Sequence, residues 1–334
     1  MRRKICKILI TGGAGFIASE IARQAIEEGY RVIVVDKLTY AGDFARLNDI
    51  SGELKFYKAD ICNKNQINSI FKKENPDIVL NLAAETHVDR SILCSLDFLE
   101  TNIRGTQVML EASKKYGVKR YIQVSTDEVY GDITKGQFFE STPIAPSSPY
   151  SASKASADLF VRSYIRTYGF PAIIVRPSNN YGPWQYPEKF IPVIIYKALK
   201  GEKVPVYAKG QNIREWLHVT DCASAILKVV KSGRDGEVYN VGSGNERENI
   251  AIVNKILGIL GKPQTLVQFV KDRPGHDLRY SLNCRKMREL GWEPRIDFDT
   301  GLKSTVIWYK ENLDWLEGKV RYLRNYWRKV YKCQ

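Results

Sequence analysis

The 334-residue sequence predicts an α/β protein, with a doubly wound parallel sheet in its larger amino-terminal part and a smaller carboxyl-terminal lobe. Two observations carry this prediction. Short apolar runs alternate with helical patterns through the first half, which is typical of parallel sheets covered by helices. After residue 178 the alternation becomes less regular. We therefore expect three regions: 1-178; 179-314, from which the chain crosses back to the first region; and a tail, 315-334.

The elements follow from short patterns, taken in chain order. Strands are expected at residues 7–11, 31–35, 54–57, 77–82, 119–124 and 172–176, and later at 238–241. A helix should follow Gly15, because Ile21, Ala22 and Ala25 fall on one face, and longer helices are expected at 96–116 and 151–168. In such sheets, ligands bind at the carboxyl ends of the strands. Polar residues directly after these strands are therefore the first candidates for a site.

Composition limits the class of protein. With 44% hydrophobic and 26% charged residues, the chain resembles an ordinary soluble globular protein. No apolar run approaches the roughly 20 residues of a membrane span, and the basic start at Met1 leads into a strand rather than a signal peptide. The six cysteines form no CxxC pair and only three histidines occur, so we expect no metal site. Scattered, unpaired cysteines favour a reducing, cytoplasmic location.

The net charge of +14 is high, and part of it lies in the tail. From Gly318 onwards there are six basic residues and no acidic one. Charge alone does not distinguish nucleic acid, a membrane surface or an anionic small ligand; with no other feature for nucleic acid, we expect none. In the tail, Leu316, Val320, Leu323, Trp327 and Tyr331 recur at helical spacing. We expect a helix packed on the body, with a membrane-surface or partner-binding helix as the alternative.

A glycine turn follows the first strand. Gly12, Gly15 and the small Ala18 fit a dinucleotide-binding turn, in which the backbone approaches a pyrophosphate at a helix N-terminus. The second strand ends in Asp36, an acid suited to the ribose hydroxyls of NAD. A 2′-phosphate would be repelled by Asp36, although Lys37 weakens that argument. We therefore predict NAD as the cofactor of a Rossmann-type domain.

Two further patterns indicate catalysis. Asp127 and Glu128 stand at the end of the strand 119–124, where the alternative is a solvated turn. Tyr150 and Lys154 are four residues apart on one helix face. A lysine ammonium beside the phenol would lower the pKa of Tyr150. Tyr196 and Lys200 have the same spacing, and we expect that pair to lie on the surface.

These motifs together resemble the extended short-chain dehydrogenase/reductase superfamily. Several stretches are similar to one of its families, the dTDP-glucose 4,6-dehydratases: residues 36–42, 84–91, 126–128, 178–183, 211–216 and 272–277. The resemblance covers residues 5 to 312. Three positions depart from the family pattern: Ala18 and Ala208 replace glycines, and Thr86 stands where serine is common.

The resemblance implies the roles of the catalytic residues. The family oxidises C4 of a nucleotide hexose, eliminates water across C5 and C6, and returns the hydride to C6. Tyr150, tuned by Lys154, would act at the C4 hydroxyl, which Thr126 would bind. Glu128 would remove the C5 proton and Asp127 would protonate the departing C6 hydroxyl.

The resemblance also implies two binding sets. The cofactor set is Gly12, Gly15, Phe16, Ile17, Asp36, Lys37, Leu38, Thr39, Asp60, Ile61, Leu82, Ala83, Ala84, Thr86, Thr101, Tyr150, Lys154 and Asn179. The set for the nucleotide sugar, in the C-terminal substrate-binding lobe, is Thr86, Thr126, Asn180, Lys189, Phe190, Ile191, Pro192, Val204, Pro205, Tyr207, Arg214, Asn249, Asp272, Arg273 and His276. Arg214 suits a diphosphate; its alternative is a salt bridge with Glu215 or Asp221.

The expectation is a cytoplasmic homodimer, paired through the helices 96–116 and 151–168, that acts on dTDP-glucose. Alternatives are a UDP-glucose 4,6-dehydratase, an epimerase or decarboxylase of the same superfamily, and an inactive NAD-binding scaffold or sensor. Intact Tyr150, Lys154, Asp127 and Glu128 argue against the inactive form.

Overall fold

The computed structural model describes residues 6–330 and contains a seven-stranded parallel sheet in the order β10-β6-β5-β4-β1-β2-β3. Its strands are β1 (Lys7–Thr11), β2 (Arg31–Asp36), β3 (Leu54–Lys58), β4 (Ile78–Asn81), β5 (Arg120–Val124), β6 (Ala172–Pro177) and β10 (Val238–Val241). This confirms the predicted fold class, and the six expected strands of the first half lie within one residue of their predicted bounds at either end. The order places β1 and β4 side by side, so the chain reverses its winding there.

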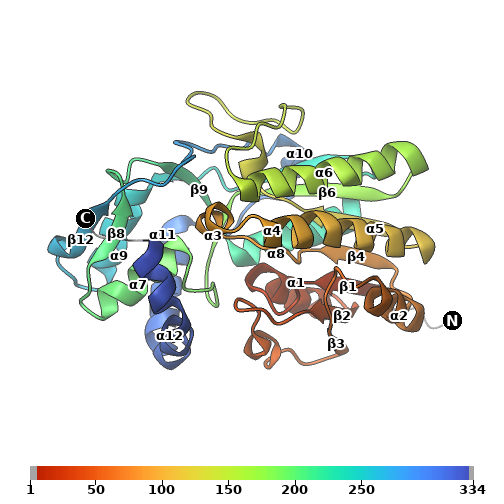
Figure 1. Cartoon of the computed structure of the whole chain (residues 1–334), viewed down its shortest axis with the longest axis horizontal. Helices are drawn as coiled ribbons and strands as arrows, with labels where there is room; N and C mark the ends of the chain where they lie inside the picture. Colours follow the sequence, from red (N-terminus) through yellow and green to blue (C-terminus); the bar gives the residue numbers. More distant parts are fainter. Residues whose placement is uncertain (1–5, 331–334) are drawn as a thin grey trace.

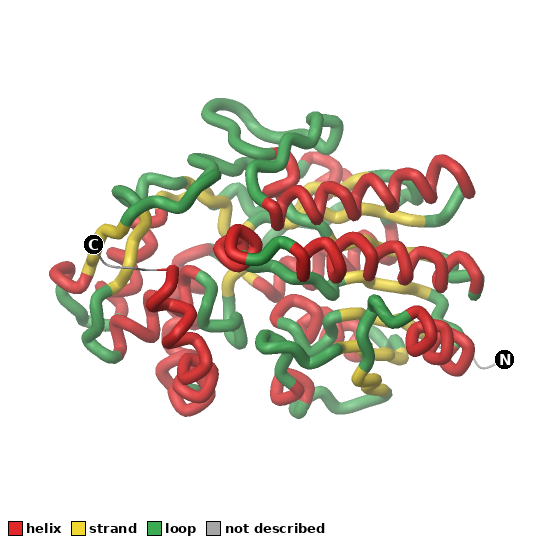
Figure 2. Tube along the Cα trace, in the orientation of Figure 1, coloured by secondary structure: helices red, strands yellow, loops and turns green. Residues whose placement is uncertain are grey.

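Helices cover both faces of this sheet (Figures 1 and 2). One face packs on α1 (Phe16–Glu27) and α8 (Val219–Ser232) through Ile8, Ile10 and their neighbours. The other packs on α2 (Lys64–Glu74), α5 (Gly105–Lys115) and α6 (Pro149–Tyr168) through Leu9, Ile33 and Val35. Successive strand residues therefore enter opposite cores, as the two-residue period of a strand requires.

The helix expected at 96–116 is not a single regular α-helix. It consists of α4 (Leu96–Phe98), a π-helical turn η2 (Leu99–Arg104) and α5. Asn102 in the π turn bonds both backbone groups of Glu85, at 2.9 and 3.0 Å, and reaches Ser153 Oγ at 2.8 Å. π turns are frequent at functional sites. Here the turn ties α5 to the loop after β4 and to α6.

Shorter elements surround the strand ends. They are η1 (Phe44–Leu47), α3 (Val88–Leu93) and η3 (Asp127–Tyr130). Arg46 in η1 is fully buried and donates to the carbonyl oxygens of Ala14 at 2.8 Å, Ala41 at 2.7 Å and Trp184 at 2.9 Å. It thereby joins the glycine turn to a loop of the second lobe.

The second lobe lies beside the large sheet (Figure 1). It holds two small sheets, β11 (Glu246–Glu248), β9 (Ile213–His218) and β7 (Asn179–Tyr181), and β12 (Val267–Val270) with β8 (Val204–Tyr207). Its helices are α7 (Phe190–Leu199), α9 (Asn249–Ile259), α11 (Phe298–Glu311), α12 (Leu313–Val330) and the short η4 (Gln264–Leu266). The short α10 (Arg285–Glu289) packs on β10 instead, and its Met287 joins the core of the large sheet. Ile194, Val206, Ile256 and Val306 are among the residues of its separate core.

The tail forms α12, and its apolar face is buried in this second core. Leu316, Val320 and Leu323 are at most 1% exposed, and Trp327 is 6% exposed. The helix packed on the body is therefore confirmed for these positions, whereas Tyr331 lies outside the described residues. In the described part of the chain, no helix is both long and apolar enough to cross a membrane.

One expectation about the surface is wrong. Tyr196 is 2% exposed, although Lys200 is exposed as predicted. The ring of Tyr196 lies 5.8 Å from that of Trp327, because α7 is enclosed by other elements of the second lobe, including α12. Residue spacing in the sequence could not show that an element 130 residues later would cover this face.

Candidate active site

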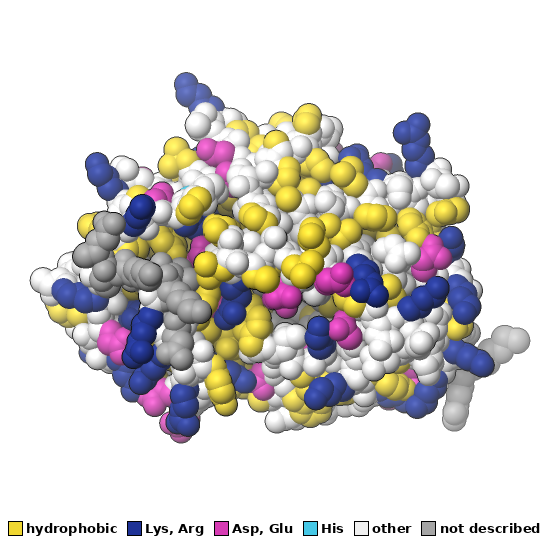
Figure 3. All heavy atoms as spheres, viewed as in Figure 1, with side chains coloured by type: hydrophobic (Ala, Val, Ile, Leu, Met, Phe, Trp, Pro, Cys, Tyr) yellow, Lys and Arg dark blue, Asp and Glu magenta, His cyan; other side chains and the backbone are white. Residues whose placement is uncertain are grey.

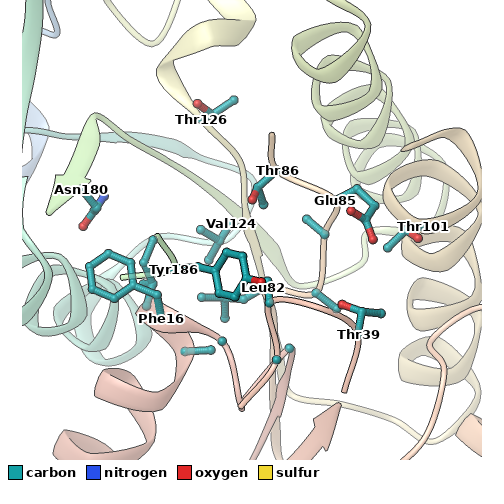
Figure 4. Close-up of a pocket in the computed structure, with 18 of the residues that line it drawn as sticks. Phe16, Thr39, Leu82, Glu85, Thr86, Thr101, Val124, Thr126, Asn180 and Tyr186 are labelled. Atoms are coloured by element: carbon teal, nitrogen blue, oxygen red, sulfur yellow. The ribbon is translucent and has the colours of Figure 1, made fainter. Parts of the chain in front are cut away.

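A large cavity opens at the carboxyl ends of β1, β2, β4 and β5 (Figure 4). In that view Phe16 and Asn180 lie on one side of the cavity and Thr101 lies on the opposite side. The floor is the glycine turn between β1 and α1. Because parallel strands end at one edge of the sheet, residues from distant segments meet here.

The glycine turn leaves no room for side chains. Gly12 has φ +67°, and a Cβ there would lie 2.9 Å from backbone atoms of Ala83. A Cβ on Gly15, which precedes the first residue of α1, would lie 2.8 Å from Gly12 O. Gly15 also provides no side-chain cap, so the backbone N–H groups of the first turn of α1 donate no bond to a capping side chain beside the cavity. This arrangement fits a pyrophosphate.

Asp36 lies at the end of β2 and is buried. Its carboxylate oxygens accept from Ala14 N at 3.0 Å and Leu38 N at 2.7 Å. Burial raises the pKa of Asp36, and these hydrogen bonds oppose the rise. The neighbouring Lys37 is paired with Asp60 at 2.8 Å. The lysine charge is thus already neutralised, and the cavity edge favours ribose hydroxyls over a 2′-phosphate.

Several buried polar atoms in the cavity walls have no protein partner. Among the described residues these include Asp127 Oδ2, Ser178 Oγ and Asn179 Oδ1. Buried polar atoms normally find a hydrogen-bond partner. Their concentration here fits a polar ligand such as a dinucleotide.

The structure brings the predicted cofactor residues together. All of them line this cavity except Leu38, whose backbone N–H bonds Asp36 while its side chain packs against the core of the first lobe. Thr126 and Asn180, predicted for the sugar nucleotide, line the same cavity.

A second cavity adjoins the first on the side of the second lobe. The two share Thr86, Glu128, Asn179, Glu188 and Lys189. Of the predicted sugar-nucleotide residues, it is lined by Thr86, Lys189, Phe190, Pro205, Tyr207, Arg214, Asn249, Arg273 and His276. Ile191, Pro192, Val204 and Asp272 line neither cavity. Ile191 and Val204 are fully buried in the second core instead, since neighbouring residues of one element point to different sides.

The adjacent carboxylates lie in different environments. Asp127 is 1% exposed, and burial, reinforced by the charge of Glu128, raises its pKa well above the usual range. Burial also raises the pKa of Glu128, but the cationic side chains of Arg273, Arg214 and Lys189 oppose the rise. Thr126 holds the turn: its hydroxyl donates to Asp127 Oδ1 at 3.1 Å and accepts from Glu128 N at 3.3 Å. Burial thus favours the protonated form of Asp127 more strongly than that of Glu128, whose carboxylate is faced by positive charge.

The Tyr150–Lys154 pair departs from the electrostatic expectation. Burial raises the pKa of Tyr150 and the charge of Glu128 adds to the rise, while a hydrogen bond with Thr126 opposes it. Burial lowers the pKa of Lys154 to about 8. The expected lowering of the Tyr150 pKa by Lys154 is therefore wrong for the protein alone. The Lys154 ammonium instead donates to Val124 O at 2.6 Å.

Arg214 forms no salt bridge with Glu215 or Asp221. Its guanidinium donates to the carbonyl oxygens of Asp277 at 2.8 Å and Leu278 at 3.2 Å, and lies 4.2 Å from the ring centroid of Tyr280. Glu215 accepts from Gly244 N and Leu282 N. The charge of Arg214 is thus held by neutral groups and remains available to an anion in the second cavity.

Some cavity residues escaped sequence reasoning. Glu188 lines both cavities with a 1% exposed side chain, and Tyr280 lines the second. Glu188 accepts from Tyr40 Oη at 3.0 Å and Arg90 Nε at 2.8 Å. Its position immediately before Lys189 was the available signal, whereas nothing local distinguished Tyr280.

Ala208 has φ +48°, a conformation that glycine adopts more easily.

Comparison with known proteins agrees with this geometry. Residues 9–305 match the family model described as GDP-mannose 4,6 dehydratase. A probable dTDP-glucose 4,6-dehydratase of Sinorhizobium fredii is 48% identical, covering 92% of this chain and 94% of the relative. The dTDP-glucose 4,6-dehydratase of Escherichia coli is 47% identical, covering 92% and 95%.

Solved structures give the same grouping. The dTDP-glucose 4,6-dehydratase DesIV of Streptomyces venezuelae, solved with NAD, superposes with a TM-score of 0.91 at 45% identity, covering 94% of this chain and 99% of that one. The UDP-glucose 4-epimerase of Thermus thermophilus, also with NAD, gives 0.86 at 30% identity over 91% and 99%. From the family model and these relatives together, the chain belongs to the GDP-mannose 4,6 dehydratase family of enzymes.

Proposed function

We propose that this enzyme is a dTDP-glucose 4,6-dehydratase, which converts dTDP-glucose to dTDP-4-keto-6-deoxyglucose and water. The observation that carries the proposal is the contrast within the Asp127–Glu128 pair at the junction of the two cavities. Elimination of water requires one acid and one base at the same time. Relatives named dTDP-glucose 4,6-dehydratases support the choice of nucleotide.

NAD, when bound, supplies a hydride acceptor for C4, a hydride donor for C6 and one positive charge. The glycine turn would hold its pyrophosphate, and Asp36 its ribose hydroxyls. Tyr150 takes the proton of the C4 hydroxyl and Thr126 orients that oxygen. Because the Tyr150 pKa is high in the protein alone, this step depends on positive charge in the cavity and on the Thr126 hydrogen bond. Lys154, which lines the same cavity, would hold the ribose of the nicotinamide.

The elimination step belongs to the carboxylates. Once C4 is a ketone, the C5 proton becomes acidic and Glu128 removes it. When C6 is later reduced, Glu128 would return a proton to C5, which restores both the base and the saturated ring carbon. Asp127, protonated because of its burial, gives its proton to the leaving C6 hydroxyl, which departs as water. The positive charges of Arg273, Arg214 and Lys189 oppose the rise that burial causes in the pKa of Glu128, which favours the ionised base. A 4-epimerase needs no such acid and base pair, which favours a dehydratase over that alternative.

The second cavity would hold the nucleotide. Arg214 and Arg273 bring positive charge for the diphosphate, and Tyr207 and Phe190 bring aromatic surface for the base. Burial lowers the pKa of His276 to about 4, so this residue is neutral and acts here only as a hydrogen-bonding group. We propose that residues 179-314 form most of the substrate-binding lobe, although α8 and β10 cross back to pack with the large sheet.

We propose a homodimer paired through helices of the large sheet. Exposed apolar side chains gather on α3, α4, η2 and α6 as a band across the face in Figure 3: Ile92, Leu93, Leu96, Leu99, Leu159 and Phe160. Such a patch, continuous over neighbouring helices, is typical of an interface between subunits. We also propose a cytoplasmic location, which the free cysteines of the described residues support.

The deciding experiment incubates purified enzyme separately with dTDP-glucose and UDP-glucose, without added cofactor, and follows product mass. Loss of one water from the dTDP sugar alone is expected, and would also show that NAD is carried tightly. Loss from the UDP sugar alone would keep the mechanism and contradict the nucleotide. No mass change with NAD added would contradict the dehydratase and leave an epimerase or an inactive NAD-binding protein, which NMR of the mixture separates.

A further inference from the structure

The helix α12 lies beyond the part of the chain that the family model matches, yet it reaches the active site from two points. Near its start, Trp315 Nε1 donates to Asp43 Oδ2 at 2.7 Å and Lys319 pairs with the same carboxylate at 2.8 Å. Asp43 N in turn donates to Ala14 O in the glycine turn at 3.0 Å. One end of the helix is thus anchored to the cofactor loop.

The other contact lies nearer the end of the helix. Tyr326 Oη is 3.1 Å from His87 Nδ1, and the two rings meet edge to face at 5.6 Å. The opposite nitrogen, His87 Nε2, is 3.1 Å from the carbonyl oxygen of Glu188. A carbonyl only accepts, so Nε2 carries the proton. Burial lowers the pKa of His87, which keeps the ring neutral, so Nδ1 accepts and the Tyr326 hydroxyl is the donor.

Tyr326 also completes an aromatic sandwich. The guanidinium of Arg90 lies 4.0 Å from the ring centroid of Tyr40 and 4.3 Å from that of Tyr326. Arg90 and Tyr40 both bond the carboxylate of Glu188, one to each oxygen. The side chain and the backbone of Glu188 are therefore fixed by groups that Tyr326 touches.

The next residue in the chain connects this cluster to the proposed base. Lys189 follows Glu188, lines both cavities and donates from Nζ to Thr86 O at 2.7 Å. Burial raises the pKa of Glu128, and the charge of Lys189 opposes that rise. A shift of the Glu188–Lys189 backbone would therefore change the electrostatic field at Glu128.

We propose that Tyr326 is a positioning residue of the active site. By donating to His87 it fixes one protonation form of that ring, and His87 then holds the Glu188–Lys189 backbone in register with Glu128. This inference rests on the proposed function. Under this proposal the helix α12 supports catalysis, in addition to packing in the second core through Leu316 and Trp327.

The test is Tyr326→Phe, with Tyr322→Phe as its matched control. Tyr322 is on the same helix and 80% exposed, so the same change there removes a hydroxyl that faces solvent. Tyr326→Phe should lower kcat about three- to tenfold, the range expected for one hydrogen bond, with little change in KM. Tyr322→Phe should match the wild type in both constants.

A second readout does not depend on turnover. The chain has three histidines, so ¹⁵N spectra of histidine-labelled enzyme are simple. The wild type and Tyr322→Phe should show His87 in the neutral form protonated at Nε2, and Tyr326→Phe should shift the Nδ1 signal, whose acceptor bond is lost. An unchanged His87 signal, or an unchanged kcat accompanied only by a lower melting temperature, would overturn the proposal. If the wild type itself fails to dehydrate dTDP-glucose, the proposed function fails, while the His87 spectra still report on the contact.

Discussion

The two cavities meet at Glu128 but are built in different ways. The cofactor cavity is formed mainly by backbone, small residues and strand ends. Positions such as Gly12 and Gly15 have no room for a side chain. The second cavity is formed by long charged and aromatic side chains such as Lys189, Arg214 and Arg273, from segments far apart in the sequence. Binding in the first cavity should depend on the space left for the ligand, and binding in the second on positive charge. Mutations in the two cavities should therefore have different effects.

The largest effect is expected where the two cavities meet. Glu128→Gln keeps the shape but removes the base, so dehydration should fall about 10²- to 10⁴-fold. Oxidation at C4 should remain, so reduced cofactor should accumulate and can be followed by its absorbance. The exposed Glu293→Gln serves as the control. Full-rate dehydration by Glu128→Gln would refute the role given to this carboxylate.

Mutations that fill space in the cofactor cavity should prevent cofactor binding. Gly12→Ala places a methyl group 2.9 Å from backbone atoms of Ala83, whereas Gly117→Ala, at nearly the same φ of +66°, meets nothing within 4 Å. Both variants should lose about 1–2 kcal/mol of unfolding free energy through the left-handed backbone. Only Gly12→Ala should lose about 1–3 kcal/mol more through overpacking and be purified without cofactor. Equal losses in both variants would contradict a shape requirement at Gly12.

Mutations that remove positive charge from the second cavity should weaken substrate binding. Arg273→Gln should raise KM about tenfold, as loss of one charged contact implies, and leave cofactor content unchanged. Burial raises the pKa of Glu128 and the positive charge of Arg273 opposes that rise, so removal of Arg273 should raise the pKa further and move the rise of the dehydration rate to higher pH. The pH profile of kcat/KM measures the shift. Arg285→Gln, which is 79% exposed in the wild type, should leave both quantities unchanged.

The smallest effect concerns stability. The folded-state pKa of Asp127 is raised, so its ionisation favours the unfolded state, and stability is lost as the pH rises through the folded pKa. Asp127→Asn removes this penalty. The variant should be equal to or less stable than the wild type below the ordinary aspartate pKa of about 4 and more stable, by roughly 1 kcal/mol or more, at neutral pH. Denaturant unfolding at several pH values checks this, and a difference independent of pH would contradict a buried, protonated Asp127.

The difference between the two cavities also explains which site residues could be predicted from the sequence. The strands and the glycine turn were predictable because local periodicity and short motifs encode them, and all but one of the predicted cofactor residues line the first cavity. Glu188 and Tyr280 were missed, and Ile191, Pro192, Val204 and Asp272 line neither cavity, because the direction of a side chain there depends on packing between distant segments. The buried state of Tyr196 likewise depends on α12. The raised pKa of Tyr150 depends on burial, which spacing does not reveal.

The contacts of Arg46 would affect how fast a bound dinucleotide exchanges with the dinucleotide of the cell. Its guanidinium ties the glycine turn to Trp184 of the second lobe, so the loop cannot swing open without breaking contacts between the lobes. A dinucleotide held beneath that loop would exchange slowly with the surrounding pool. Since the proposed reaction returns its hydride to the sugar, slow exchange would cost no turnover. Flux through such an enzyme would then be insulated from the ratio of oxidised to reduced nicotinamide in the cell, and would follow the supply of sugar nucleotide alone.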